Sequence, residues 1–230
     1  MSQKLDLVPV SDGLWTVKVP FRMFGLALQG RTHVVQLPDG GVAVHTPSRL
    51  PDATWDEITR LGPVRALLAP NKMHHLAFGD AAARFPEARK LAAPGLAEKR
   101  RDLTFDGVLG DQADPVFAGT LVPLHVPGMP MLEEVAFLHP ATRTLLLVDL
   151  LFHFPTAAGL TRLYLKMSGA LGKPAQTAIL RRAVKDRART RAALDRLLDL
   201  DFDRVLLAHD TTVETGGKEA LRDASAWLTV

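Results

Sequence analysis

The sequence predicts an α/β fold in which helices cover layers of strands. A helical pattern from Asp52 to Leu61 lies between two apolar strand patterns, Val42 to His45 and Val64 to Leu68, and this alternation is typical of a helix-covered sheet. The chain has 230 residues, of which 47% are hydrophobic and 23% charged. That length and composition suit one ordinary globular domain with a sizeable core. We therefore expect a single domain over residues 1–230.

The first strands are predicted by short apolar runs that end at turn residues. They are Leu14 to Val19, His33 to Gln36 and Val42 to His45. The turn Pro38-Asp39-Gly40-Gly41 joins the last two. In the helix that follows, Asp52 is a candidate N-cap, and Gly62-Pro63 ends the helix before the buried strand from Val64.

Beyond residue 75 the pattern changes from helix to strands. Leu76 to Phe85 predicts a helix, and Lys90 to Ala92 predicts a short strand before the turn Pro94-Gly95. The second half is rich in strands. These are Leu121 to Val126, Glu134 to Leu138, Thr144 to Val148 and, near the end, Val205 to Ala208.

A mainly helical insertion, from about residue 155 to residue 200, precedes the last strands. Ala157 to Leu171 is apolar and contains several small residues, which favours a lid over a site or a contact in a homodimer. Ala175 to Arg191 is rich in basic residues, most simply a solvated helix face. The alternative is anion recognition, with Arg181 and Lys185 one helical turn apart and facing a substrate.

Histidine and aspartate residues stand where apolar strands end. The pair His74-His75 follows one such run, Asp149 follows a second, and His209 follows a third. A single histidine at a strand end is more often structural than functional, but three strand ends of this kind favour a metal site. Imidazole and carboxylate are the usual ligands of zinc, iron and manganese.

The order of these segments carries a family resemblance over most of the chain. The relevant runs are 61–64 (LGPV), 69–76 (APNKMHHL), 93–96 (APGL), 134–139 (EVAFLH) and 143–150 (RTLLLVDL). The chain resembles the metallo-β-lactamase superfamily and, within it, a group of bacterial domains without an established activity. The superfamily carries a His-x-His-x-Asp-His loop, a Pro-Gly-His turn, a Gly-Asp strand end and a late histidine. The resemblance implies a four-layer αββα sandwich with a helical insertion before the last strands.

Compared with the superfamily motif, the chain has lost one of two metal sites. Pro70, Lys72 and Met129 occupy the first-site positions, and none of them suits a divalent cation. The second-site positions are His74, which replaces an aspartate, His75 and His209, with Asp149 at the bridging position. The resemblance therefore implies one divalent ion held by His74, His75, Asp149 and His209. Zinc is the first choice, iron or manganese are alternatives, and an inactive site would hold no ion.

The same correspondence suggests further roles around this ion. Lys72 would place a positive charge near the vacated site, beside Asp149, and both would act in catalysis. His45 stands where the superfamily carries an aspartate that orients the loop, and His125 precedes the Pro-Gly turn and could swing inward. We expect His45 and His125 to support the ligands, and Met129 to form part of the pocket wall.

Two functions remain open at this point. The first is a single-metal hydrolase of an ester, amide, thioester or phosphoester, and a small anionic molecule is one candidate substrate. The second is a non-catalytic binding or scaffold protein that keeps the fold and a degenerate site.

Composition narrows the partners and the compartment. The chain has no cysteine, which excludes disulfides and thiolate ligands and fits a cytoplasmic location. Its first residues lack the pattern of a signal peptide, and no apolar stretch is long enough to span a membrane. A net charge of +3 is too small to argue for nucleic acid. We therefore expect that neither a membrane nor nucleic acid is a partner. We do expect a homodimer that forms through the helical insertion.

Overall fold

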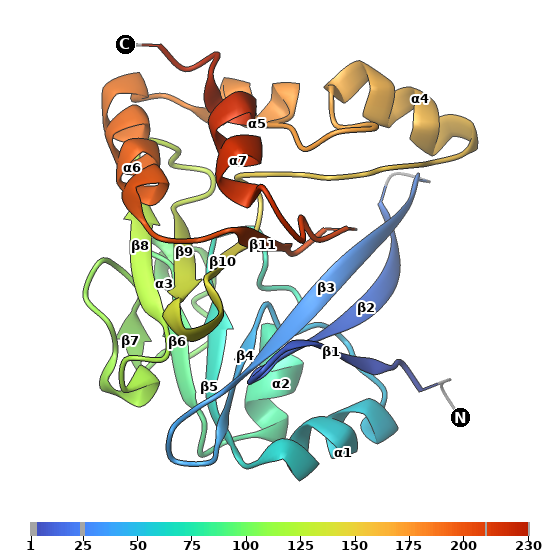
Figure 1. Cartoon of the computed structure of the whole chain (residues 1–230). Coiled ribbons are helices and arrows are strands. Elements are labelled where there is room, and N and C mark those ends of the chain that lie inside the picture. Colours follow the sequence, from blue (N-terminus) through green and yellow to red (C-terminus); the bar gives the residue numbers. More distant parts are fainter. Residues whose placement is uncertain (1–3, 24–25, 210, 230) are drawn as a thin grey trace.

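The computed structural model describes all residues except 1–3, 24–25, 210 and 230. Its strands form two sheets (Figure 1). The first sheet contains, in spatial order, β1 (Leu7–Ser11), β2 (Leu14–Met23), β3 (Leu26–Gln36), β4 (Val42–His45), β5 (Val64–Ala69), β6 (Arg89–Ala92) and β7 (Gly107–Val108). The second contains β11 (Arg204–Leu207), β10 (Thr144–Leu147), β9 (Glu134–His139) and β8 (Val122–Val126). Strands β4 to β7 are parallel, and so is the pair β10 and β11.

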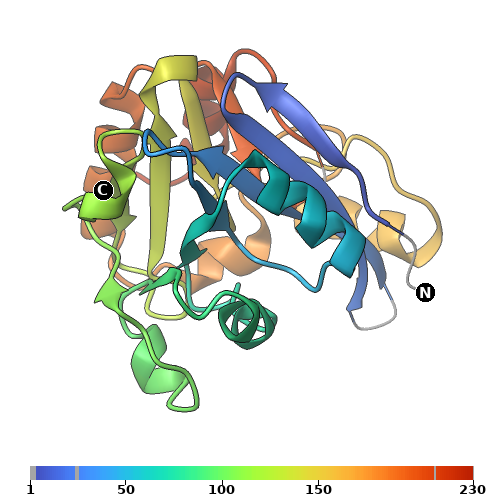
Figure 2. The same cartoon turned by 90° about the horizontal axis from the view of Figure 1, so that it is seen from below.

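Helices cover the outer face of each sheet, as the two views in Figures 1 and 2 show. The helices are α1 (Asp52–Leu61), α2 (Phe78–Arg84), α3 (Leu96–Lys99), α4 (Gly159–Ser168), α5 (Ala178–Ala183), α6 (Arg187–Asp199) and α7 (Gly217–Ser225), with short 3₁₀ turns at Pro115–Phe117 and Pro140–Thr142. Helices α1, α2 and α3 pack on the first sheet, and α6 and α7 pack on the second.

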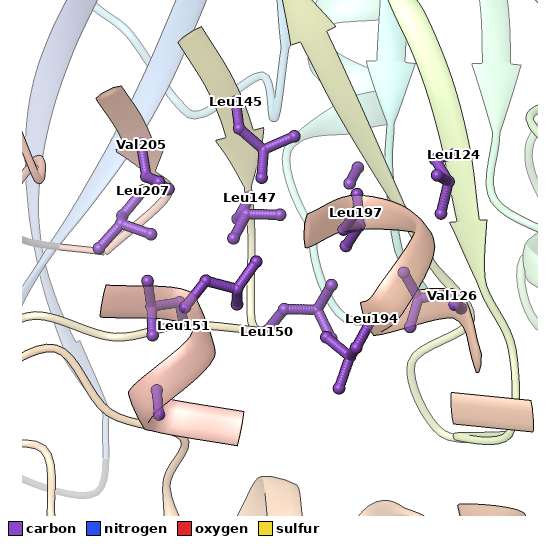
Figure 3. Packing of buried hydrophobic residues seen from close by; sticks show 14 of the residues in the cluster. Leu124, Val126, Leu145, Leu147, Leu150, Leu151, Leu194, Leu197, Val205 and Leu207 are labelled. Carbon is purple, nitrogen blue, oxygen red and sulfur yellow. The ribbon is translucent and has the colours of Figure 1, made fainter. Parts of the chain in front are cut away.

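The core has three main layers of buried apolar side chains, which together define the αββα order. A central layer lies between the sheets and joins residues such as Leu68 of β5 to Phe137 of β9. A second layer joins the first sheet to α1 and α2. In the third, Leu194 and Leu197 of α6 pack on Leu147 of β10, as Figure 3 shows. The expected four-layer sandwich is confirmed.

Several local predictions need correction. β1 was not expected, and β2 and β3 form a longer hairpin than the sequence pattern indicated. Asp52 does not cap α1. The N-cap residue is Pro51, and the Asp52 carboxylate instead accepts a hydrogen bond from Arg84. No helix in the described part of the chain is long and apolar enough to cross a membrane.

The insertion contains three helices, and its basic run is interrupted. Helix α5 ends at Ala183, and α6 begins after Asp186, whose carboxylate accepts a hydrogen bond from the backbone N–H of Arg189. An aspartate at this position is a favourable N-cap. Residues 184–186 therefore separate two helices, and Arg181 and Lys185 do not share a helix.

Candidate metal centre

Three strands from the two sheets end at the same edge of the sandwich. His74 lies in the loop after β5, Asp149 follows β10, and His209 follows β11. Backbone hydrogen bonds fasten the sheets together here, because Val135 N–H donates to the Pro70 carbonyl and Arg31 N–H to the Ala208 carbonyl, each at 2.8 Å. The carboxyl ends of parallel strands commonly carry functional residues.

The side chains of His74, Asp149 and His209 converge. The two imidazole Nε2 atoms are 3.0 Å apart. One Asp149 oxygen lies 3.1 Å from His209 Nε2, and the other lies 3.6 Å from His74 Nε2. Ligand atoms around a tetrahedral zinc ion with bonds of about 2.0–2.2 Å are roughly 3.3–3.6 Å apart. The donor set and its spacing therefore fit one divalent ion.

Asn71 organises this group, a role that the sequence interpretation missed. Its side-chain carbonyl accepts hydrogen bonds from the backbone N–H groups of Met73 and His74, at 2.9 and 2.8 Å. Its amide nitrogen donates to Asp149 at 2.7 Å and to Glu134 at 3.3 Å. One side chain thus fixes the turn that carries His74 and the carboxylate that faces it.

Glu134, at the start of β9, is the second residue that was missed as part of the site. Its side chain is fully buried, and its carboxylate accepts backbone hydrogen bonds from Val148 at 2.8 Å and Asp149 at 2.7 Å. The sequence did contain a signal for this role, namely a glutamate at the start of a mostly apolar strand. A buried carboxylate needs specific hydrogen-bond donors or a cation beside it.

The electrostatics of the group favour a cation. Burial and the neighbouring Asp149 raise the pKa of Glu134 to about 7. Burial opposes ionisation of Asp149 as well, but His74 and His209 outweigh it and hold the pKa of Asp149 well below its usual range. For His74, the two carboxylates outweigh burial and raise the pKa, whereas burial lowers the pKa of His209. A positive charge is therefore stabilised beside Asp149.

Aromatic rings form an apolar wall beside His209. Phe152 stacks on the His209 ring with 5.2 Å between centroids, and Phe154 stacks on Phe152 at 6.3 Å. The ring centroid of Phe21, on β2, lies 6.2 Å from that of His209. This wall is apolar, so a substrate that reached the ligands would meet an apolar surface next to them.

The structure separates His75 from the other predicted ligands, and we remove it from the ligand set. Among the described residues, the only group of three or more histidine, aspartate or glutamate side chains whose ligand atoms lie within 4.8 Å of one another is that of His74, Asp149 and His209. His75 Nδ1 instead lies 2.8 Å from Arg100 Nη1 and accepts its hydrogen bond. Burial and the cations of Lys99 and Arg100 lower the pKa of His75.

Lys72 does not form the expected ion pair with Asp149. Its ammonium group donates to the Pro130 carbonyl at 2.9 Å, and within the described part of the chain Asp149 has ion-pair contacts only with His74 and His209. The position beside Asp149 that we assigned to Lys72 is taken by the Asn71 amide. The catalytic role predicted for Lys72 therefore has no geometric support.

The two histidines expected to support the ligands lie elsewhere. His125 pairs with Glu133, with 2.8 Å between Nε2 and the carboxylate, and does not swing inward. His45 is fully buried between His33 and Phe137, and neither of its ring nitrogens has a hydrogen-bond partner among the described residues. It therefore does not orient the loop through a hydrogen bond. Met129 belongs to the core layer under α6.

The predicted substrate-binding pair is also not brought to the site. The Arg181 guanidinium lies 5.3 Å from the Trp227 ring centroid and donates to the Gln176 carbonyl. The Lys185 side chain is exposed, after the end of α5. Arg181 therefore lies beside Trp227, just after α7.

This sandwich, with its candidate metal ligands at the strand ends, has the metallo-β-lactamase fold. A metallo-β-lactamase from Pontibacter korlensis has a TM-score of 0.69 at 14% identity, with 98% of this chain and 99% of that chain covered. The mono-zinc form of the metallo-β-lactamase FIM-1 from Pseudomonas aeruginosa has a TM-score of 0.68 at 14% identity, covering 98% and 96%. A metal-soaked Flv1 flavodiiron core from Synechocystis sp. PCC6803 has a TM-score of 0.67 at 13% identity, with 98% of this chain and 61% of that chain covered. No family model and no curated protein matches the sequence.

Proposed function

We propose that this protein is a single-metal hydrolase and that its 230 residues form one domain. The observation that carries the proposal is the convergence of two imidazole Nε2 atoms and one carboxylate within 3.6 Å of one another. His74, Asp149 and His209 would hold the ion, and zinc suits this donor set best. A divalent ion held there would supply a Lewis acid and lower the pKa of a water molecule toward neutrality.

The chain's own residues would have three tasks in this reaction. Glu134 and Asn71 orient Asp149 and the turn that carries His74, in the way that outer partners tune metal ligands elsewhere. Phe152, supported by the buried Phe154, would accept an apolar part of the substrate and exclude water beside His209. The proposed substrate is a small ester, thioester, amide or phosphoester.

A hydrolysis panel tests the proposal. Zinc-loaded wild-type protein should hydrolyse at least one ester, thioester, amide or phosphoester, and His209→Ala should lose more than the roughly 10- to 100-fold that loss of an outer partner costs. His125→Ala is the matched control, because this histidine lies on β8 and pairs with Glu133, and the variant should retain the activity.

A specific observation favours a second function. Pro70, Lys72 and Met129 stand where the superfamily motif carries the ligands of a first metal, so the chain is also compatible with a binding protein that holds an ion without catalysis. Zinc binding that depends on His209, together with no hydrolysis across the whole panel, would identify that alternative and contradict the hydrolase proposal.

A further inference from the structure

Helix α4 presents an apolar stripe to solvent. The side chains of Leu160, Leu163 and Met167 are 77%, 56% and 78% exposed, and their spacing places them on one face of the helix. The other face is anchored, because Leu165 is buried in a small cluster with Phe154 and Ala170. The stripe is therefore a fixed surface feature, and its apolar side chains gain from leaving water.

A row of basic residues borders this stripe. Arg162 and Lys166 are exposed, one helical turn apart, and neither forms an ion pair with any described residue. The whole segment from Leu150 to Lys185 contains no aspartate or glutamate. Its basic residues are all exposed, and they are Arg162, Lys166, Lys173, Arg181, Arg182 and Lys185.

We propose that α4 docks on an anionic lipid surface. An apolar stripe beside a basic row is the arrangement of helices that lie in the plane of a bilayer, with apolar side chains among the lipids and cations at the headgroups. Figure 1 shows α4 at the periphery of the molecule, with α5 along the same edge. The proposal departs from our expectation that no membrane is a partner, which considered only spanning segments.

A second copy of the chain is a poorer occupant of this face. A symmetric dimer through α4 would bring two identical basic segments together without a carboxylate on either side, since residues 150–185 contain none. Like charges that face each other across an interface oppose association. Anionic headgroups provide the complementary charge that another copy lacks. The proposal is independent of the metal centre.

The absence of cysteine in the chain permits a site-specific probe. Met167→Cys is labelled with an environment-sensitive fluorophore and mixed with phosphatidylcholine vesicles that contain phosphatidylglycerol, or with pure phosphatidylcholine vesicles. Val108→Cys is the matched control, because Val108 is 70% exposed on β7, the edge strand of the first sheet that lies four strands away from β3, the strand that α4 contacts. We expect a blue shift only for the label at position 167, and only with the anionic vesicles.

Vesicle co-sedimentation tests the two components separately. Arg162→Gln and Lys166→Gln should each weaken binding about fivefold at low salt, and Leu160→Ser with Leu163→Ser should weaken it further. Arg60→Gln, on the exposed face of α1, should leave binding unchanged. Circular dichroism checks that each variant is folded, and the two charge variants suffice if the serine variant does not fold.

Three results would overturn the proposal. One is no binding of the wild-type protein to anionic vesicles at low salt. Another is equal binding by the wild-type protein and both charge variants. The third is a concentration-dependent dimer in solution that Leu163→Ser abolishes, since this would assign the face to a second copy of the chain.

Discussion

Zinc should raise the thermal unfolding midpoint of this protein by several degrees. His74, Asp149 and His209 converge in the folded chain, and an ion that binds only this state stabilises it by mass action. The gain is about 2.7 kcal/mol when free metal is a hundredfold above its dissociation constant. For a chain of this size, each kcal/mol corresponds to roughly 2–4 °C. A thermal melt with and without zinc, monitored by circular dichroism, measures the shift.

Adjacent residues provide the control for this experiment. His74→Ala and His209→Ala remove proposed ligands and should abolish the zinc-dependent shift. His75→Ala removes a histidine that contacts Arg100 instead, and its shift should equal that of the wild-type protein. A shift that survives in His209→Ala but disappears in His75→Ala would contradict the assigned ligand set.

Replacement of Glu134 by alanine should lower the free energy of unfolding by about 2–4 kcal/mol. The carboxylate accepts hydrogen bonds from the buried backbone N–H groups of Val148 and Asp149, and each donor left without a partner costs roughly 1–3 kcal/mol. Loss of the carboxylate's own burial cost offsets part of this. Denaturant unfolding measures the change, and zinc affinity should fall about 10- to 100-fold in the same variant.

Two further variants separate this effect from a loss of charge. Glu98→Ala removes an exposed carboxylate from α3 and should change stability by about 0.5 kcal/mol or less. Glu134→Gln keeps the shape but places an amide N–H₂ group against backbone donors, so it should also destabilise the protein. Wild-type stability in Glu134→Gln would show that the two backbone hydrogen bonds are not the source of the effect.

Most strands and helices could be predicted from the sequence because their signals are local, whereas the four-layer order was implied by the family resemblance. The apolar run from Val64 to Leu68 became β5, and the pattern from Asp52 to Leu61 became α1 with the same bounds. The placement of Asp149 and His209 directly after apolar strands followed from the same patterns, and the structure adds that these two strands are parallel neighbours. An apolar run predicts where a strand ends to within a residue or two, and therefore which side chains follow the strand.

The details of the loop after β5 were beyond such signals. Asn71 hydrogen-bonds the backbone of residues 73 and 74 and so turns the chain, which directs His74 to Asp149 while His75 meets Arg100. That contact joins positions 25 residues apart in the chain. A motif position can be assigned from spacing, but the direction of each side chain depends on such longer-range partners.

Charge pattern alone also misplaced the substrate-binding pair. Arg181 and Lys185 have the spacing of one helical turn, but Asp186 caps a new helix, and the backbone N–H groups of Lys185 and Asp186 both donate to the Gly128 carbonyl. The chain therefore leaves the helix at Ala183. A run of basic residues in the sequence does not indicate where a helix ends when the end is stabilised by a carbonyl group far away in the chain.

Crystals grown with zinc and measured at the zinc absorption edge test most directly whether His74, Asp149 and His209 hold one metal ion. We expect one anomalous peak per chain, at about 2.0–2.2 Å from Nε2 of His74, Nε2 of His209 and a carboxylate oxygen of Asp149. No peak at this position in zinc-saturated crystals, or a peak bonded to His75, would contradict it.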